Sequence, residues 1–367
     1  MQRLQRMCGC MYCKLHSLVV LFLISALVLL TGCDNKPAEH LSDTRLMLDT
    51  YCTIVIHGDV DSALLDEAFA LCAELEALLS ITIEGSDIWR INHAGGEAVE
   101  VHPRTMEVIK AGLELGELSE GMFDITIGRL TRLWDFGSGE GKIPSDDDIK
   151  EALKSVDIGG VRIDGDAVQV IMPRRQGLVD GDIVRDVRPQ GDNWYGWIDL
   201  GAIAKGYIAE VVATFLSLRG ASGVMIDLGG DVTTVGNRAD GNPWRIALRK
   251  PFGSMDEWIG IVDASDIAVV SSGIYERQFE ANGVLYHHIL DPFTGMPVET
   301  DVVNAVIIAE NALIGEGLST IAVLVGSERA PEYFEQIQGF ICAVLVLEDG
   351  EILIIGDMRF LTIGEPG

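Results

Sequence analysis

The spacing of apolar side chains divides most of the chain into helical and extended stretches. Residues 61–79 place apolar side chains every three or four positions, which predicts an amphipathic helix. The same pattern predicts helices over residues 104–119, 203–216 and 311–325, and Gly220 follows the third helix as a stop signal.

Short runs rich in β-branched residues lie between these helices and predict strands. Residues 161–172 have the pattern of a hairpin that turns at Asp164-Gly165, whereas 137–148 and 173–193 are polar and predict a loop and an exposed insertion. Further strands are predicted within 45–58, in the run that ends in MIDLGGDVTTVG, and around 244–250, 259–264, 267–271, 284–290, 302–309, 341–347 and 351–355. So many adjacent strands favour an α+β fold, with mixed or antiparallel sheets and packed helices, over a doubly wound sheet.

The amino-terminal residues have the pattern of an export signal. Residues 1–17 carry three basic side chains and no acidic one, and residues 18–30 are apolar apart from one serine. The apolar run is too short for a comfortable transmembrane helix. The following LTGC matches a bacterial lipobox, in which Cys33 becomes the lipidated first residue. An uncleaved amino-terminal anchor is the less favoured alternative.

This pattern predicts three parts of the chain. Residues 1–32 are expected to be a lipoprotein signal peptide, 33–44 a polar tether and 45–367 the folded domain. Either interpretation of the signal places the domain outside the cytoplasm and held at a membrane. We therefore expect a lipid-anchored protein on the periplasmic face of an inner membrane or on the outer surface of the cell membrane.

Charge and cysteine content narrow the function classes. A formal net charge of −29 argues against a nucleic-acid partner, and an anionic ligand would need a local positive charge or a metal. Apart from the amino-terminal cysteines, only Cys52, Cys72 and Cys342 remain. They lie in apolar surroundings without metal-ligand spacing, which indicates buried free thiols, with one disulfide as the alternative.

The stretch WIDLGAIAKGY, residues 197–207, joins a strand-like run to a helix through small residues. A helix amino terminus offers free amides and a partial positive charge, and Lys205 lies in its first turn. Ile-Asp-Leu-Gly occurs here at 198–201 and again at 226–229, on both sides of one helix, which suggests a ligand crevice. From these residues alone, a phosphate-binding loop and an ordinary strand-to-helix turn are equally favoured.

Three other stretches carry candidate chemistry, and each has a plain structural alternative. Glu316 and Thr320 share a helix face and suit Mg²⁺, although an isolated Glu is more often at the solvent edge of a helix. Alternation along a strand puts His287 and the next residue, His288, on opposite faces, so that one faces a cleft. The aromatic residues of 119–137, which are Phe123, Trp134 and Phe136, suit either a slot for a planar ligand or core packing.

Taken together, these stretches resemble the FAD:protein FMN transferases, the ApbE family. The matching blocks are MLDTYCTIVIHG, SDIWRIN, SEGMFDITIG, IDLGAIAKGY, IDLGGDVTTVG, PWRIALRKP, VVSSGIYERQF, HILDPFTGMPV and the Glu316–Thr320 helix. They follow the family order from Met47 to about Gly326. The resemblance implies an ApbE-like, T-fold-like architecture for residues 45–367. It also implies an enzyme that cleaves FAD with Mg²⁺, releases AMP and joins FMN to a Thr or Ser hydroxyl of an acceptor flavoprotein.

The resemblance also implies roles for individual residues. It assigns the metal to the Ala202 carbonyl, Glu316 and Thr320. For the reaction that it implies, we expect catalysis by His288, as proton acceptor, and by Lys205, which would offset charge on the leaving AMP. The positions expected to contact FAD are Met47, Met122, Phe123, Asp124, Asp199, Lys205 and His288. Most members have Asp where this chain has Glu316, so the metal site departs from the family pattern at one ligand.

Other functions remain open at this stage. The Glu at position 316 favours a FAD pyrophosphatase that hydrolyses FAD to FMN and AMP, or a FAD-binding lipoprotein, as the first alternative. A surface or solute-binding lipoprotein without enzymatic activity is the second. For a transferase, the family implies as acceptor a subunit of a membrane electron-transfer complex or a related extracytoplasmic flavoprotein.

Overall fold

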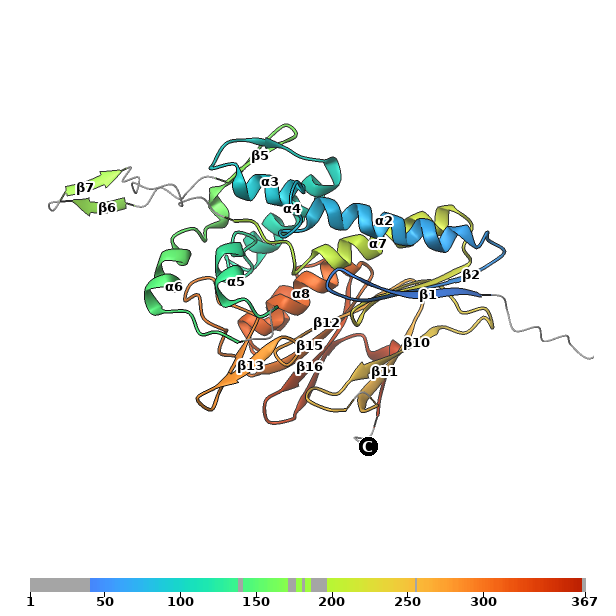
Figure 1. Cartoon of the computed structure of the whole chain (residues 1–367). Helices are drawn as coiled ribbons and strands as arrows, with labels where there is room; N and C mark the ends of the chain where they lie inside the picture. Colours follow the sequence, from blue (N-terminus) through green and yellow to red (C-terminus); the bar gives the residue numbers. More distant parts are fainter. Residues whose placement is uncertain are drawn as a thin grey trace, which may run out of the picture. The chain divides into compact units, whose positions relative to one another are not determined.

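An eight-stranded antiparallel sheet organises the chain (Figure 1). Its order is β1-β2-β8-β9-β12-β15-β16-β17. The strands are β1 His40–Met47, β2 Thr50–His57, β8 Gly223–Leu228, β9 Asp231–Gly236, β12 Ala268–Gly273, β15 Val302–Ala309, β16 Phe340–Leu347 and β17 Ile352–Gly356. The computed structural model describes residues 40–137, 141–170, 176–179, 182–185, 197–254 and 256–364. The predicted signal peptide and Cys33 lie outside these ranges.

Three helices cover one face of this sheet: α2 (Ala63–Leu79), α7 (Ala204–Leu218) and α8 (Ala312–Val325). Helix α7 packs on β8 and β9, and α8 packs on β12 and β15. Their apolar faces form the main core with buried side chains of β2 and β8, which explains the helical periodicity of the sequence. The layer arrangement and the antiparallel pairing confirm the predicted α+β class.

A smaller antiparallel sheet covers part of the opposite face. It consists of β10 (Trp244–Arg249), β11 (Trp258–Ala264) and β18 (Leu361–Ile363). Apolar side chains of β10 and β11 pack against Val306 of β15 and Val344 of β16. The central strands are therefore buried on both faces, and β15 is buried along its whole length.

The other described α-helices and strands lie outside the two sheets and three helices named above. The helices are α3 Asp87–His93, α4 Pro103–Leu118, α5 Gly128–Trp134, α6 Asp146–Leu153 and α9 Ala330–Phe334. The strands are β3 Val99–Glu100, β4 Val161–Asp164, β5 Ala167–Val170, β6 Gln176–Val179, β7 Asp182–Arg185, β13 Gln278–Ala281 and β14 Val284–His287. In the described part of the chain, no helix has the length and apolar character needed to cross a membrane.

The structure corrects three expectations about local structure. Residues 40–44, assigned to the tether, belong to β1 and pair with β2, so the folded unit begins at His40. Residues 146–148 are not loop but the first turn of α6, because the Ser145 side chain caps the helix and three acidic residues favour its amino terminus. The run before Gly201 is not a strand, since only Trp197 forms a bridge, with Ile127.

Two further expectations are confirmed. Cys52, Cys72 and Cys342 are buried free thiols. Burial raises the pKa of Cys52 and Cys342 to about 11 and that of Cys72 to about 12, which keeps all three protonated at neutral pH. The predicted hairpin turns at Gly165-Asp166, one residue later than expected.

Candidate active site

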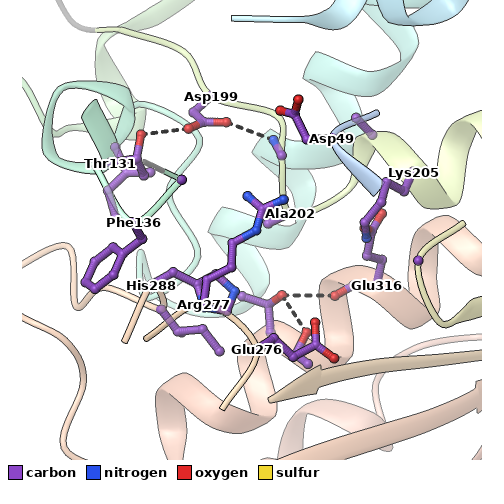
Figure 2. Close-up of a pocket in the computed structure, with 18 of the residues that line it drawn as sticks. Asp49, Thr131, Phe136, Asp199, Ala202, Lys205, Glu276, Arg277, His288 and Glu316 are labelled. Atoms are coloured by element: carbon purple, nitrogen blue, oxygen red, sulfur yellow. Dashed lines mark hydrogen bonds and ion pairs between the residues drawn. The ribbon is translucent and has the colours of Figure 1, made fainter. Parts of the chain in front are cut away.

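A cavity of about 950 Å³ lies where loops meet the carboxyl-terminal end of α2, the first turns of α7 and the side of α8. This volume is at the upper end of the range for pockets that hold small molecules and cofactors. Nine of the residues predicted for the site line it: Met122, Phe123, Asp124, Asp199, Ala202, Lys205, His288, Glu316 and Thr320. Figure 2 shows several of them around one space, although they come from segments far apart in the sequence. The structure thus brings the predicted residues together.

Met47 is the exception, because it does not line the cavity. It ends β1, packs against the main core, and its carbonyl accepts a hydrogen bond from Cys52 Sγ at 3.5 Å. The next two residues, Leu48 and Asp49, form the turn between β1 and β2 and line the cavity in its place. Strand pairing directs Met47 toward the core and leaves the turn to face the site.

Lys205, Asp231 and Glu316 form a buried charge cluster at one end of the cavity. Lys205 Nζ lies 2.5 Å from Asp231 Oδ2 and also forms an ion pair with Glu316 Oε1. The carboxylate side chains are 9% and 4% exposed, so water screens this cluster poorly. Hereafter the three side chains are called the cation cluster.

Backbone amides hold both carboxylates of the cation cluster in place. Glu316 Oε2 accepts the Gly206 N–H at 2.7 Å, and Asp231 Oδ1 accepts the Ser271 N–H at 3.0 Å. At position 206, a β-carbon would approach the Ala312 carbonyl oxygen to 2.6 Å. Glycine there lets α7 approach α8 closely enough for this contact.

Burial and pairing act in opposite directions on the ionisation of the cluster. Burial lowers the pKa of Lys205, but the adjacent carboxylates of Asp231 and Glu316 outweigh it and hold that pKa above its usual value. Burial raises the pKa of Glu316, and the ammonium of Lys205 acts against this shift. The lysine is therefore charged at neutral pH, and each carboxylate depends on it for neutralisation.

The oxygen atoms near Glu316 suit a hard cation. Thr320 Oγ1 donates to the Glu316 carbonyl at 3.2 Å and lies 3.2 Å from Ser272 Oγ. The Gly206 N–H donates to Glu316 and not to the carbonyl of Ala202, four residues earlier. Ala202 lines the same cavity. A carboxylate, a hydroxyl and a carbonyl match the preference of Mg²⁺ for oxygen. In the described residues, no group of three or more His, Cys, Asp or Glu side chains is arranged for a metal.

Asp199 lies at another part of the cavity wall and has neutral partners. Its Oδ2 accepts the Thr131 hydroxyl at 2.7 Å, and its Oδ1 accepts the Gly201 N–H at 2.9 Å (Figure 2). The preceding residue is fixed by Asn92, whose side-chain amide bonds both the N–H and the carbonyl of Ile198. This segment is held by hydrogen bonds although it has no regular secondary structure.

Asp124 organises the loop before α5 with its carboxylate. Oδ1 accepts the N–H and the hydroxyl of Thr126 at 2.7 and 2.6 Å, and Oδ2 accepts the Ile158 N–H at 3.0 Å. Burial raises the pKa of this carboxyl, and the hydrogen bonds act against that shift. Asp124 therefore lines the cavity with both oxygens already bound by the protein.

The aromatic residues of 119–137 divide between the two roles considered for them. Phe123 and Phe136 line the cavity, as expected for a slot. Trp134 is fully buried, stacks on Phe136 with ring centroids 5.5 Å apart, and donates from Nε1 to the Gly295 carbonyl at 2.8 Å. Trp134 is thus core packing that supports the cavity wall.

The two adjacent histidines face different surroundings, as the alternation predicted. His288 lines the cavity, whereas His287 is buried and its Nε2 lies 3.2 Å from the Val298 carbonyl oxygen. Burial, with help from Arg277, lowers the pKa of His288 to about 4, so its imidazole is neutral at pH 7. In the described chain, His288 Nδ1 is buried without a hydrogen-bond partner.

Several cavity residues were not foreseen from the sequence. Asp231 directly follows the second Ile-Asp-Leu-Gly and the glycine after it, so the repeat itself was a signal for it. Glu276, Arg277 and Arg249 also line the cavity, and Figure 2 shows Arg277 reaching toward Ala202. Burial raises the pKa of Glu276. These side chains lie in two of the matching blocks, PWRIALRKP and VVSSGIYERQF, in which no single residue was predicted to contact a ligand.

The chain is similar to known proteins along most of its length. The model of the ApbE family matches residues 48–345. The chain belongs to the ApbE family. That match covers both turns of the repeat, the histidine pair and α8, and it confirms the resemblance noted in the sequence.

Individual ApbE relatives agree with this assignment. The FAD:protein FMN transferase of Vibrio cholerae is 31% identical over 335 residues, with 89% of this chain and 93% of the relative covered. The FAD:protein FMN transferase of Treponema pallidum is 29% identical and covers 85% of each chain. The crystal structure of the ApbE protein from Thermotoga maritima superposes with a TM-score of 0.74 at 31% identity, covering 88% of this chain and 98% of the other.

Proposed function

We propose that this protein is a FAD:protein FMN transferase. It takes FAD, cleaves the bond between the two phosphates, releases AMP and attaches FMN through a phosphoester to a Thr or Ser of an acceptor flavoprotein. The observation that carries the proposal is the arrangement of one cavity, in which Lys205 and Glu316 form a charged end and Figure 2 shows the ring of Phe136 at the opposite end. A diphosphate suits the first end, and a flat ring system suits the second.

The charged end has a donor set for Mg²⁺. Glu316, the Thr320 hydroxyl and the Ala202 carbonyl would hold the ion. When bound, Mg²⁺ supplies Lewis-acid stabilisation of charge on the diphosphate. Lys205 lies beside the same carboxylate and would neutralise the charge that develops on the departing AMP. Both functions need positive charge in a strongly acidic protein.

His288 has the properties needed to accept the proton in this transfer. The acceptor hydroxyl oxygen bonds to the phosphorus of the FMN half, the bond from that phosphorus to the AMP phosphate breaks, and the hydroxyl proton passes to the imidazole. The ring is neutral at pH 7, and its Nδ1 has no partner among the described residues. An anionic diphosphate nearby would raise its pKa from about 4 toward neutrality and make it a better base.

Intact-protein mass spectrometry tests the function directly. The enzyme is incubated with FAD, Mg²⁺ and a candidate acceptor, and the acceptor is expected to gain one FMN while AMP appears in equal amount. An acceptor variant without the target hydroxyl is the control and should gain nothing. AMP and free FMN without a modified acceptor would instead support the pyrophosphatase alternative, which the Glu at position 316 favours. Failure to bind FAD at all would reject both.

We further propose that the enzyme is a lipoprotein anchored through Cys33, after removal of residues 1–32. The basic flank, the apolar run and the lipobox support this proposal. The cavity would then lie outside the cytoplasm, and a subunit of a membrane electron-transfer complex would be the acceptor. Cys33→Ala should release the protein from membranes or stall its processing. A variant that stays membrane-bound at the mature size would contradict the anchor.

A further inference from the structure

We propose that Lys205 is an exchangeable internal cation, which occupies the place of Mg²⁺ on Glu316 until the metal displaces it, an exchange that FAD favours. The inference rests on the proposed function, because it concerns the same site. In the ligand-free state the ammonium neutralises both carboxylates of the cation cluster. Mg²⁺ takes over Glu316 when the ammonium turns away from it, and a phosphate of FAD favours this turn, with Asp231 as the remaining protein partner of Lys205.

The geometry of the cation cluster supports this exchange. Asp231 and Glu316 each use one oxygen for a fixed backbone N–H and the other for the same ammonium. The carboxylates are therefore held by the fold, whereas the cation between them sits at the end of a flexible side chain. The lysine side chain is 28% exposed and lines the cavity, so it has room to turn toward a ligand.

Charge balance explains why the two cations compete. A divalent ion on Glu316 would stand next to the ammonium bound to the same carboxylate, in a poorly screened site, and like charges there repel. The cluster of two carboxylates and one ammonium has one net negative charge, whereas the diphosphate of FAD adds further negative charge. Displacement of Lys205 from Glu316 onto that diphosphate keeps every negative group next to a positive one. Binding of FAD is then expected to favour binding of the metal.

Metal binding without FAD provides the first test. Lys205→Met removes the competing cation, so calorimetric titration with MgCl₂ alone should show about tenfold to a hundredfold tighter binding than for the parent. Lys150→Met is the matched control, because Lys150 is 71% exposed on α6 and does not line the cavity. It removes the same charge and should bind Mg²⁺ like the parent. Equal or weaker binding by Lys205→Met would overturn the inference.

The second test uses the unaltered protein and does not depend on how a variant folds. Acetylation of lysine by an N-hydroxysuccinimide ester, followed by peptide mass spectrometry, reports how free each amine is. Mg²⁺ should increase the labelling rate of Lys205 relative to that of Lys150, because the ammonium leaves Glu316. FAD without metal should decrease it. A labelling rate of Lys205 that falls or stays constant with Mg²⁺ would contradict the exchange.

The outcomes separate this inference from the proposed function. If FMN transfer occurs but neither test responds as expected, Lys205 is a fixed ion pair and only the inference fails. If Mg²⁺ displaces Lys205 but the protein neither binds nor cleaves FAD, the exchange stands and the proposed function fails.

Discussion

Two carboxylates in the cavity wall have the same kind of backbone contact but different second partners. Glu316 accepts the Gly206 N–H at 2.7 Å, and Asp199 accepts the Gly201 N–H at 2.9 Å. The other oxygen of Glu316 is bound by a lysine ammonium, whereas that of Asp199 is bound by the Thr131 hydroxyl. One acid is thus balanced by a charge and the other by a neutral group.

The different partners of Glu316 and Asp199 suit the two carboxylates to different roles in one site. A carboxylate neutralised by a cation exchanges that cation for another, so Glu316 responds to metal and to anionic ligands. A carboxylate held by neutral donors keeps its shape and its negative charge, so Asp199 is suited to accept hydrogen bonds from a ligand. The elements differ as well, because Glu316 lies on α8 whereas Asp199 lies in a segment without regular secondary structure.

Glu316→Gln should have the largest effect on activity. It keeps the shape and an acceptor for the Gly206 N–H but removes the charge that balances Lys205, so Mg²⁺-dependent release of AMP from FAD should fall at least about a hundredfold. Glu310→Gln is the control, because Glu310 is exposed and lies away from this cavity. Thermal unfolding should show that both variants fold. Full activity of Glu316→Gln at limiting Mg²⁺ would remove the distinction between the two carboxylates.

The pH dependence of stability should report on His288, which lines the same cavity. Its pKa is lowered from 6.5 to about 4 in the folded protein, so the unfolded chain binds a proton first as pH falls. The stability that this neutral ring contributes is therefore present above pH 6.5 and is lost between about 6.5 and 4, up to about 3 kcal/mol.

Denaturant unfolding at a series of pH values measures this loss. His288→Gln should flatten the curve in that interval, whereas His93→Gln, which changes a more exposed histidine on α3, should leave it in place. An unchanged curve in His288→Gln would show that other groups cause the acid sensitivity. FAD should shift the loss to higher pH, since phosphate charge favours the protonated ring.

Asp199→Asn should weaken FAD binding by about tenfold, less than the loss of activity at Glu316. The amide oxygen still accepts the Gly201 N–H, and the NH₂ group donates to the Thr131 hydroxyl, which then donates to the Gly128 carbonyl 3.1 Å away, so the loop is kept and the negative charge is lost. Thr131→Val removes the hydroxyl alone and should give a smaller loss. Quenching of FAD fluorescence measures both. If Asp199→Asn binds FAD like the parent, the carboxylate supports the loop and does not contact the ligand.

The sequence allowed much of the fold to be predicted because burial imposes periodicity. Helix α8 was expected at 311–325 and observed at Ala312–Val325, and β15 was expected and found at 302–309. The run before Gly201 was misassigned as a strand because a buried extended segment has the same apolar pattern whether or not it pairs with neighbours. Hydrogen bonds from Asn92, distant in sequence, hold that run instead.

The sequence allowed most residues of the site to be predicted, but not the contacts between them. Motif resemblance identified Lys205 and Glu316, yet their ion pair spans 111 positions, and no local pattern announces it. Asp231, their third partner, was missed although the repeat lies directly before it, because the repeat does not show which side chain pairs with Lys205. Met47 was placed one position too early because the family block begins directly before a turn, and only strand pairing decides which of its residues faces the cavity.

Ala202→Gly should have the smallest effect and therefore tests how Ala202 works. We assign its role to the backbone carbonyl, which the substitution keeps, while only a methyl group is lost. FAD affinity and Mg²⁺ affinity should each stay within about twofold, and the free energy of unfolding should fall by about 0.5–1 kcal/mol from added backbone freedom. Ala202→Pro is the matched opposite, because it restricts both this residue and Gly201 in the loop that also contacts Asp199. Calorimetric titration of both variants measures these affinities. A large loss of Mg²⁺ affinity in Ala202→Gly would mean that the methyl group shapes the site. The parts of the cavity wall around Glu316 and around Asp199 would then differ less than their hydrogen bonds indicate.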